Sequence, residues 1–180
     1  SFEGGEENFR SIVLAANEVS SYAKRAEGHV MLFLTLHDEV DREKFFIRYE
    51  SLQEQIVVLE DRARDPEAIN ILSNIQSQTD EFLPAGETLL AAYDKDIADT
   101  GNFEAETHEE LIGEFHDIAS SIRSLGVELA DIETDLEAQA KANAIQYAEN
   151  TQRNIMIVVI VAVIIAVVLG FIVSKTISNP

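Results

Sequence analysis

Hydrophobic residues recur at alternating spacings of three and four over long parts of the chain. The first uninterrupted series comprises Phe9, Ile12, Ala16, Val19, Ala23, Ala26, Val30 and Phe33. A second uninterrupted series comprises Leu111, Phe115, Ile118, Ile122, Leu125, Leu129, Ile132 and Leu136. This spacing places each series on one face of a helix, as in helical bundles and coiled coils.

Two shorter series lie between these. One comprises Phe45, Tyr49, Leu52, Ile56 and Leu59, and the other comprises Leu72, Ile75, Thr79, Phe82, Gly86, Leu89 and Tyr93. Thr79 and Gly86 interrupt the second of them. Strand-like alternation of polar and apolar residues is missing from the sequence, so the pattern predicts an all-α fold.

Residues typical of helix ends separate the four series. Asp38 or Asp41 is suited to cap the second helix, and Asp65 precedes a proline at the start of the third. Thr107 stands three residues before a glutamate, the spacing of a capping box. These signals predict helices over 3–37, 41–64, 66–98 and from 105 onward. Because the connections are short, we expect an antiparallel up-down-up-down four-helix bundle.

One segment near the C-terminus is apolar throughout. Residues 155–173 contain no charged or polar side chain, and as a helix they would extend about 28 Å, close to the hydrocarbon thickness of a bilayer. We interpret them as a transmembrane helix. Ala162, Ala166 and Gly170 lie on one of its faces, where small residues allow a second helix to pack closely, unless the spacing is chance.

The fourth helix has no stop signal before this apolar segment, so it is predicted to continue into the transmembrane helix. Beyond Leu136 its seam positions become amides, namely Gln139, Asn143, Gln146 and Asn150. Polar seam residues weaken helix packing. This stretch is therefore either a plain spacer or a soft, signal-transmitting stalk that can rotate or slide.

Charge is distributed unevenly along the chain. The formal net charge is −20, and all 33 acidic but only 12 of the 13 basic residues precede residue 155. Such acidity argues against nucleic acid binding. The absence of cysteine excludes disulfides and thiolate metal sites. The chain opens without a cleavable signal. If this region lies outside the cytoplasm, an export signal or a first membrane helix must precede it, so we expect the chain to be a fragment.

No catalytic constellation is found, and we expect neither enzymatic activity nor a cofactor. His108 begins a zinc-protease-like motif, but Ile112 occupies the position of the second histidine. His37 and His108 both extend hydrophobic seams and are predicted to face the core at the same end of the bundle. With the nearby acids Asp38, Asp41, Glu104 and Glu106, they could form a metal-binding or proton-sensing site. The alternative is that both histidines are solvated at the end of the bundle, so metal binding stays open.

Three further residues are candidates for ligand binding. Arg25 and Arg123 are suited to an anionic ligand, although intrahelical pairing with acids is the simpler interpretation. Pro84, inside the third helix, predicts a kink or break that opens a pocket between helices, or a kink that binds nothing.

The layout resembles the sensor module of methyl-accepting chemotaxis proteins and sensor histidine kinases. After the apolar segment, Ile177, Ser178 and Pro180 match the Ile-Ser/Thr-x-Pro pattern that opens a HAMP linker. The resemblance implies an extracytoplasmic bundle, a cytoplasmic C-terminus in the cell membrane, and a parallel homodimer. It also implies a small-molecule or protein ligand and cytoplasmic signalling partners, reached through an output module beyond Pro180.

We therefore predict transmembrane signal transduction. The predicted domains are a sensor bundle over 1–154, a transmembrane helix over 155–173 and the start of a HAMP-like linker over 174–180. Two alternatives stay open: a tail-anchored cytosolic coiled-coil protein similar to SNAREs, and a passive membrane-anchored stalk protein.

Overall fold

The computed structural model describes the backbone of residues 2–178 and the side chains of residues 5–169. Its elements are α1 (Phe2–Leu36), α2 (Glu39–Arg62), α3 (Pro66–Thr100), the 3₁₀ helix η1 (Ala105–His108) and α4 (Glu109–Ser178). The described residues contain no strand, which confirms the all-α class. The first three helices begin and end within two residues of the predicted limits.

The turn between α1 and α2 forms around His37. This residue adopts a left-handed conformation with φ of 59°, and its N–H donates to the carbonyl of Phe33 at 2.8 Å. Asp38 then caps α2 by accepting from the N–H of Val40 at 3.0 Å. His37 is consequently exposed in the turn, rather than continuing the buried face of α1 as its spacing predicted.

The other two connections also have defined ends. Asp65 caps α3 as predicted, through bonds from the N–H groups of Glu67 and Ala68. The capping box predicted at Thr107 does not form, because residues 105–108 are a 3₁₀ helix and the Thr107 hydroxyl donates to the carbonyl of Glu104 at 2.7 Å. Helix α4 therefore begins four residues later than predicted, at Glu109.

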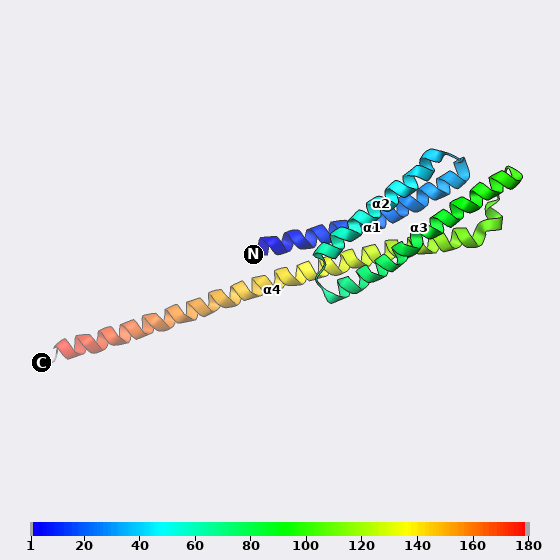
Figure 1. The fold of residues 1–180 in the computed structure, drawn as a ribbon. Coiled ribbons are helices and arrows are strands. Elements are labelled where there is room, and N and C mark those ends of the chain that lie inside the picture. The colour runs from blue at the N-terminus through cyan, green and yellow to red at the C-terminus, as the bar shows by residue number, and fades with distance from the viewer. Residues whose placement is uncertain (1, 179–180) are drawn as a thin grey trace. The chain divides into compact units, whose positions relative to one another are not determined.

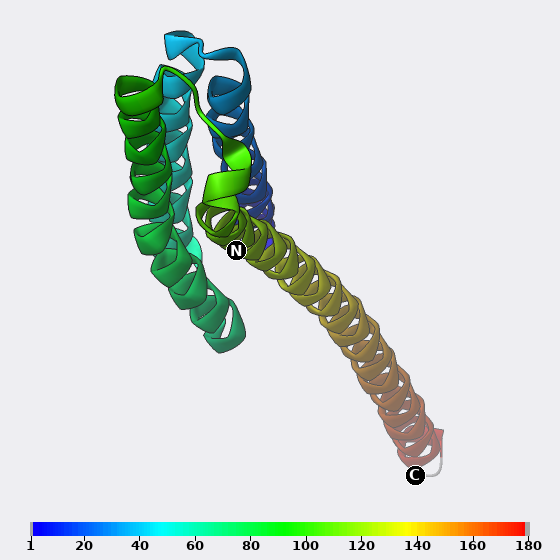
Figure 2. The same ribbon diagram turned by 90° about the vertical axis from the view of Figure 1, so that its right-hand side faces the viewer.

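Residues 1–136 make up one compact unit, and residues 137–180 make up a second. Within the first unit α1 and α2 lie side by side and run in opposite directions, as do α3 and the first part of α4 (Figures 1 and 2). All four helices contribute to one hydrophobic core. Its largest fully buried side chains are Phe33, Phe45, Phe82, Phe115, Ile12, Leu52, Leu59, Ile75, Leu89, Leu90, Ile122 and Leu129.

A cluster of three phenylalanines connects α2, α3 and α4 inside this core. The rings of Phe82 and Phe115 stack at 4.9 Å, and Phe45 meets each of them edge-on at 5.9 Å. Gly86, which interrupts the hydrophobic series of α3, makes room for this cluster, since a Cβ there would come within 2.4 Å of the Phe45 ring. The Phe45 ring occupies the space that a side chain at position 86 would take, so Gly86 is part of the core packing.

Pro84 does not break α3, which is continuous from Pro66 to Thr100. A proline inside a helix cannot donate to the carbonyl four residues earlier, here that of Asp80. The helix continues through the next turn, where the Thr88 hydroxyl donates a hydrogen bond to the carbonyl oxygen of Pro84 at 2.7 Å. The predicted break is thus absent.

Helices α1 and α4 approach each other closely at Gly126. A Cβ at this position would lie 2.8 Å from the carbonyl oxygen of Ala16 and 3.2 Å from the amide nitrogen of Ser20. Only a glycine allows backbones to come this near without displacement.

The second unit contains the apolar segment. Within the described residues, α4 is the one helix that is long and apolar enough to cross a membrane. The large apolar side chains from Ile155 to Leu169 are all exposed in the isolated chain. The four amide residues, Gln139, Asn143, Gln146 and Asn150, are exposed as well.

Candidate functional site

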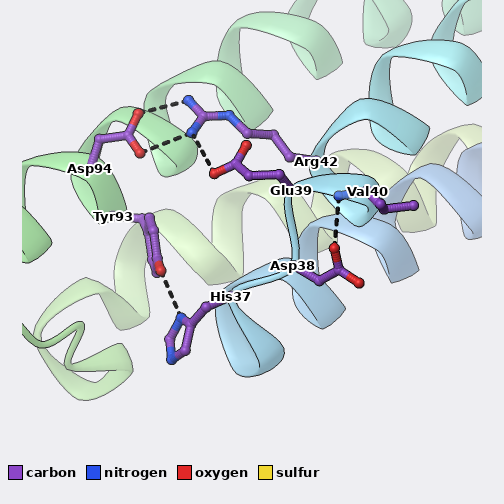
Figure 3. Close-up of polar contacts among 7 residues, drawn as sticks. All are labelled: His37, Asp38, Glu39, Val40, Arg42, Tyr93 and Asp94. Atoms are coloured by element: carbon purple, nitrogen blue, oxygen red, sulfur yellow. Dashed lines mark hydrogen bonds and ion pairs between the residues drawn. The ribbon is translucent and has the colours of Figure 1, made fainter.

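Polar and aromatic side chains gather where the α1–α2 turn meets the end of α3 (Figure 3). We call this region, residues 33–42 and 93–108, the two-turn end. Tyr93 is 8% exposed, and its hydroxyl lies 2.7 Å from Nδ1 of His37. Burial raises the pKa of Tyr93, and the negative charges of Glu39 and Asp94 add to this rise. The Tyr93 hydroxyl therefore keeps its proton, and it lies within hydrogen-bonding distance of the His37 ring.

A second histidine belongs to the same cluster. The ring of Phe103 lies 5.4 Å from that of Tyr93 and stacks in parallel on His108 at 5.2 Å. Nε2 of His108 lies 2.8 Å from Oδ2 of Asp96. The structure thus joins the two predicted histidines through aromatic rings. Over the described residues, no group of three or more metal-ligating side chains is placed to hold an ion.

An ion pair links α2 to α3 at the same end. The two terminal nitrogens of Arg42 donate to the two carboxylate oxygens of Asp94 at 2.9 and 2.7 Å (Figure 3). Oε1 of Glu39 lies 3.8 Å from Nη1 of the same arginine. The hydrogen bond to Asp94 raises the pKa of Arg42, so the guanidinium stays charged. The guanidinium carbon also lies 5.4 Å from the centre of the Phe33 ring. These contacts fix the turn of α1 and α2 against α3.

Arg123 lies in the middle of the bundle, where it binds an internal carboxylate. Its Nη1 donates to Oε2 of Glu27 at 2.8 Å, and Nδ1 of His116 lies 2.5 Å from Oε1 of the same glutamate. Glu27 is 8% exposed, so this charge is largely removed from water and compensated across α1 and α4. Arg25 is exposed and lies over the ring of Tyr22 at 5.8 Å. The two arginines thus have separate, intramolecular contacts.

His29 forms a third connection between helices. Its Nδ1 lies 2.9 Å from Oδ1 of Asp41, which joins α1 to α2, and Lys44 approaches the same carboxylate at 3.9 Å. Sequence reasoning selected His37 and His108 but missed His29 and His116. All four histidines contact a side chain from another element. Their isolated positions in the sequence carry no signal of these partners.

Pro84 lines a groove between α3 and α4. The groove holds cavities of about 360 and 560 Å³ that share Glu81, Glu114 and Ile118. The lining residues are Gln78, Asp80, Glu81, Pro84, Ala85, Thr88, Glu110, Leu111, Gly113, Glu114, Asp117 and Ile118. They include five carboxylates and neither lysine nor arginine. An opening therefore lies beside Pro84, and it is separate from Arg25 and Arg123.

A third cavity, of about 690 Å³, lies against α4 on another side of the bundle. It is lined by Ser20, Glu67, Ser120, Arg123, Ser124, Val127, Glu128, Asp131, Ile132 and Asp135. Arg123 is the one cation of this lining, and its charge is already shared with Glu27.

Glu133 is a buried acid that the hydrophobic pattern did not select. It is 1% exposed, and its Oε1 has no hydrogen-bond partner in the described structure. Burial raises the pKa of Glu133, and the negative charge of Asp65 raises it further. One signal was available: Glu133 follows Phe115 by five full turns at 3.6 residues per turn, so both lie on the same stripe of α4.

The remaining predicted residues lie in the second unit. Ala162 and Ala166 are exposed in α4. Gly170, Ile177 and Ser178 are also part of α4, where side chains are not described, and Pro180 lies outside the described residues.

Comparisons with known proteins agree with a helical bundle. No family model matches the chain, and no curated protein matches its sequence. Among solved structures, a chain of the XylFII–LytSN complex is similar, with a TM-score of 0.62 and 13% sequence identity. The match covers 70% of this chain and 98% of that one. At this identity the likeness concerns the fold alone.

Proposed function

We propose that the chain is the sensory and membrane-spanning part of a transmembrane receptor. One observation carries this proposal: α4 contributes Phe115, Ile122 and Leu129 to the buried core, and the same helix contains the apolar segment 155–173. A change in bundle packing is thereby linked, through a continuous backbone, to the membrane. The similarity in fold to one protein of a two-protein complex supports a sensory role.

In the proposed arrangement the helices form an up-down-up-down bundle outside the cytoplasm, with the C-terminus inside. A stimulus displaces α4 relative to α1, and the membrane helix passes this motion to a cytoplasmic output module. Ala162, Ala166 and Gly170 form the packing face of a parallel homodimer in the bilayer. This part of the receptor transmits a conformational change and catalyses no reaction.

The stimulus is a small molecule or a second protein. The matched solved structure is a complex of two proteins, which supports a protein partner. The groove beside Pro84 supports a small ligand, because it is concave and combines apolar with polar groups.

Protease accessibility tests the orientation. In intact cells, protease added outside should digest residues 1–150 and leave the segment from Lys175 onward protected. A tag at each end and cells opened by detergent provide the controls. Protection of the acidic bundle would overturn the proposed orientation and favour the tail-anchored alternative.

Substitutions in the amide stretch test its role as a transmitter. Replacing Gln139, Asn143 and Gln146 together by leucine should raise thermal stability and fix the output of the full receptor, because an apolar seam favours one packing. The matched control replaces Thr151 and Gln152, exposed polar residues off this seam, by leucine. Normal signalling amplitude in the triple variant would reduce the amide stretch to a spacer.

A further inference from the structure

Glu133 lies at the opposite end of the bundle from the aromatic cluster, beside the turn between α2 and α3. We call this region, residues 61–67 and 129–136, the one-turn end. At 1% exposure the Glu133 side chain is as buried as the leucines of the core, and its Oε1 receives no hydrogen bond in the described structure. Burying an ionised carboxylate without donors is costly, whereas the neutral acid is tolerated far better.

The cations of the one-turn end do not compensate this carboxyl group. The guanidinium of Arg64 is directed to the backbone, where it donates to the carbonyl oxygens of Ala63 and Asp61. Arg62 contributes its carbonyl oxygen as the acceptor for the amide of Asn8 at 3.3 Å. Oε1 of Glu133 thus receives no hydrogen bond from either arginine in the described structure.

A neighbouring acid disfavours a negative charge on Glu133. Asp65 accepts two backbone N–H bonds as the cap of α3 and therefore stays in place as a negative charge. Besides Glu133, the charged residues of the two segments of the one-turn end are Asp61, Arg62, Arg64, Asp65, Glu67, Asp131 and Asp135. The start of α1, which contacts Arg62 through Asn8, carries Glu6, Glu7 and Arg10. Burial raises the pKa of Glu133, and the negative charge of Asp65 raises it further, so both favour the protonated form of Glu133.

The size of the missing partner is limited by the burial. A second copy of the chain or a protein ligand cannot reach an atom enclosed in this way without first opening the bundle. A metal ion is not favoured either, since the described residues offer no group of three ligating side chains. A proton is small enough to bind this oxygen without opening the bundle.

We propose that Glu133 is a proton-binding site that couples the proton concentration of the surrounding solution to the packing of α4 at the one-turn end. With the proton bound, the neutral carboxyl stays in the core. When the proton leaves, the charge draws the side chain toward water and loosens the last turn of α4 before Leu136, where the compact unit ends. The link from this loosening to signal output rests on the proposed function, whereas the proton site does not.

The sign of the pH effect follows from linkage. The pKa of Glu133 is raised in the folded chain, so the folded state holds this proton over a pH range in which the unfolded chain has lost it. The contribution of Glu133 to stability is therefore most favourable in acid. It declines as the pH rises above the usual glutamate range and through the raised value.

The test uses the full chain in phospholipid nanodiscs, with Glu133→Gln as a neutral variant of the same shape. Glu128→Gln is the control, because Glu128 is an exposed acid on the same helix. At pH 8 the Glu133→Gln variant should melt roughly 2–4 °C above the native chain, and the gap should close as the pH is lowered. The control should show a small gap that does not depend on pH. A gap in Glu133→Gln that is absent, reversed or independent of pH would overturn the proposal.

Infrared spectroscopy gives a second measurement that does not depend on stability. As the pH is lowered, the native chain should show the carbonyl band of one protonated carboxyl group above the pH at which the exposed glutamates begin to take up protons. Glu133→Gln should lose this band, and Glu128→Gln should retain it. A native spectrum without the band would overturn the proton site, while leaving the protease result on membrane orientation unaffected.

Discussion

At the two-turn end of the bundle, Tyr93 and Arg42 each find a partner on another element, whereas at the one-turn end Glu133 is buried without one. At the two-turn end the side chains of Tyr93 and Arg42 are hydrogen-bonded, whereas Oε1 of Glu133 at the one-turn end is not. Nε of Arg48, in the first half of α2, is the other buried side-chain atom without a partner in the described structure. A satisfied polar network restrains the helices that it connects, and an unsatisfied buried group favours any motion that exposes it. The pairing of polar groups thus divides the bundle into a fixed end and a responsive end.

This division suits the proposed transmission of a signal. The α1–α2 turn is held against α3 by the contacts of His37 and Arg42, so it is a poor place for movement. Helix α4 leaves the compact unit after Leu136, only three residues beyond Glu133. The least restrained buried group therefore lies next to the segment that has to move.

The largest effect is expected when the fixed end loses its central ring. Phe33 is fully buried, and its ring lies 4.6 Å from Tyr93. Phe33→Ala should lower the free energy of unfolding by about 3–5 kcal/mol, through lost burial and the cavity left behind. Leu36→Ala, at a position that is 62% exposed in the same region, is the control. Urea denaturation that shows equal losses for both variants would contradict a packed, fixed end.

The contact of α4 with α1 is tested by two glycines of the same helix. Gly126→Ala should destabilise the bundle by about 1–3 kcal/mol, because the new Cβ would meet the backbone oxygen of Ala16 at 2.8 Å. Gly113→Ala has open space within 4 Å and should stabilise it by up to about 1 kcal/mol through helix propensity. Thermal melts of both variants measure these stability changes. A change of the same sign in both would argue against the close approach of α4 to α1 at Gly126.

Much of the fold was predictable because the buried face of each helix is determined by the spacing of hydrophobic residues along the sequence. Over a long helix, however, the buried face drifts away from a strict seven-residue spacing. Seven residues turn an ideal helix about 20° short of two full turns. Three heptads after Leu111 the offset reaches about 60°, so the buried face passes from Ile132, which is half-buried, to Glu133.

The polar contacts were not predictable in the same way. Glu27 and Arg123 are 96 residues apart, and their pairing depends on how α1 and α4 are rotated about their axes. Neither helix encodes that rotation locally, so the sequence suggested an anionic ligand or an intrahelical acid for Arg123, whereas its partner is Glu27 on another helix. His37 continued the spacing of α1, but a left-handed backbone turned it out of the helix. Tertiary geometry therefore decides the site, while spacing decides the helices.

A smaller effect is expected from the hydrogen bond between Tyr93 and His37. Tyr93→Phe keeps the ring and removes the hydroxyl that lies 2.7 Å from Nδ1. The loss should be about 0.5–1.5 kcal/mol of unfolding free energy. Tyr147→Phe, at a residue that is 75% exposed, should leave stability unchanged. If both substitutions have equal effects in chemical denaturation, this bond does not help to hold the α1–α2 turn.

The smallest effect concerns the ion pair between Arg42 and Asp94, whose side chains are 27% and 49% exposed. Asp94→Asn should cost about 0.2–1 kcal/mol at low salt. The substitution also removes one negative charge from a chain of net charge −20, which by itself relieves repulsion. Asp99→Asn removes the same charge from an exposed position of the same helix, so the difference between the two variants isolates the pair. Because salt screens exposed charges, that difference should shrink as sodium chloride is raised from about 0.05 to 1 M. A difference that persists in high salt would mean that the bidentate geometry of this pair, rather than its charge, restrains α2 against α3.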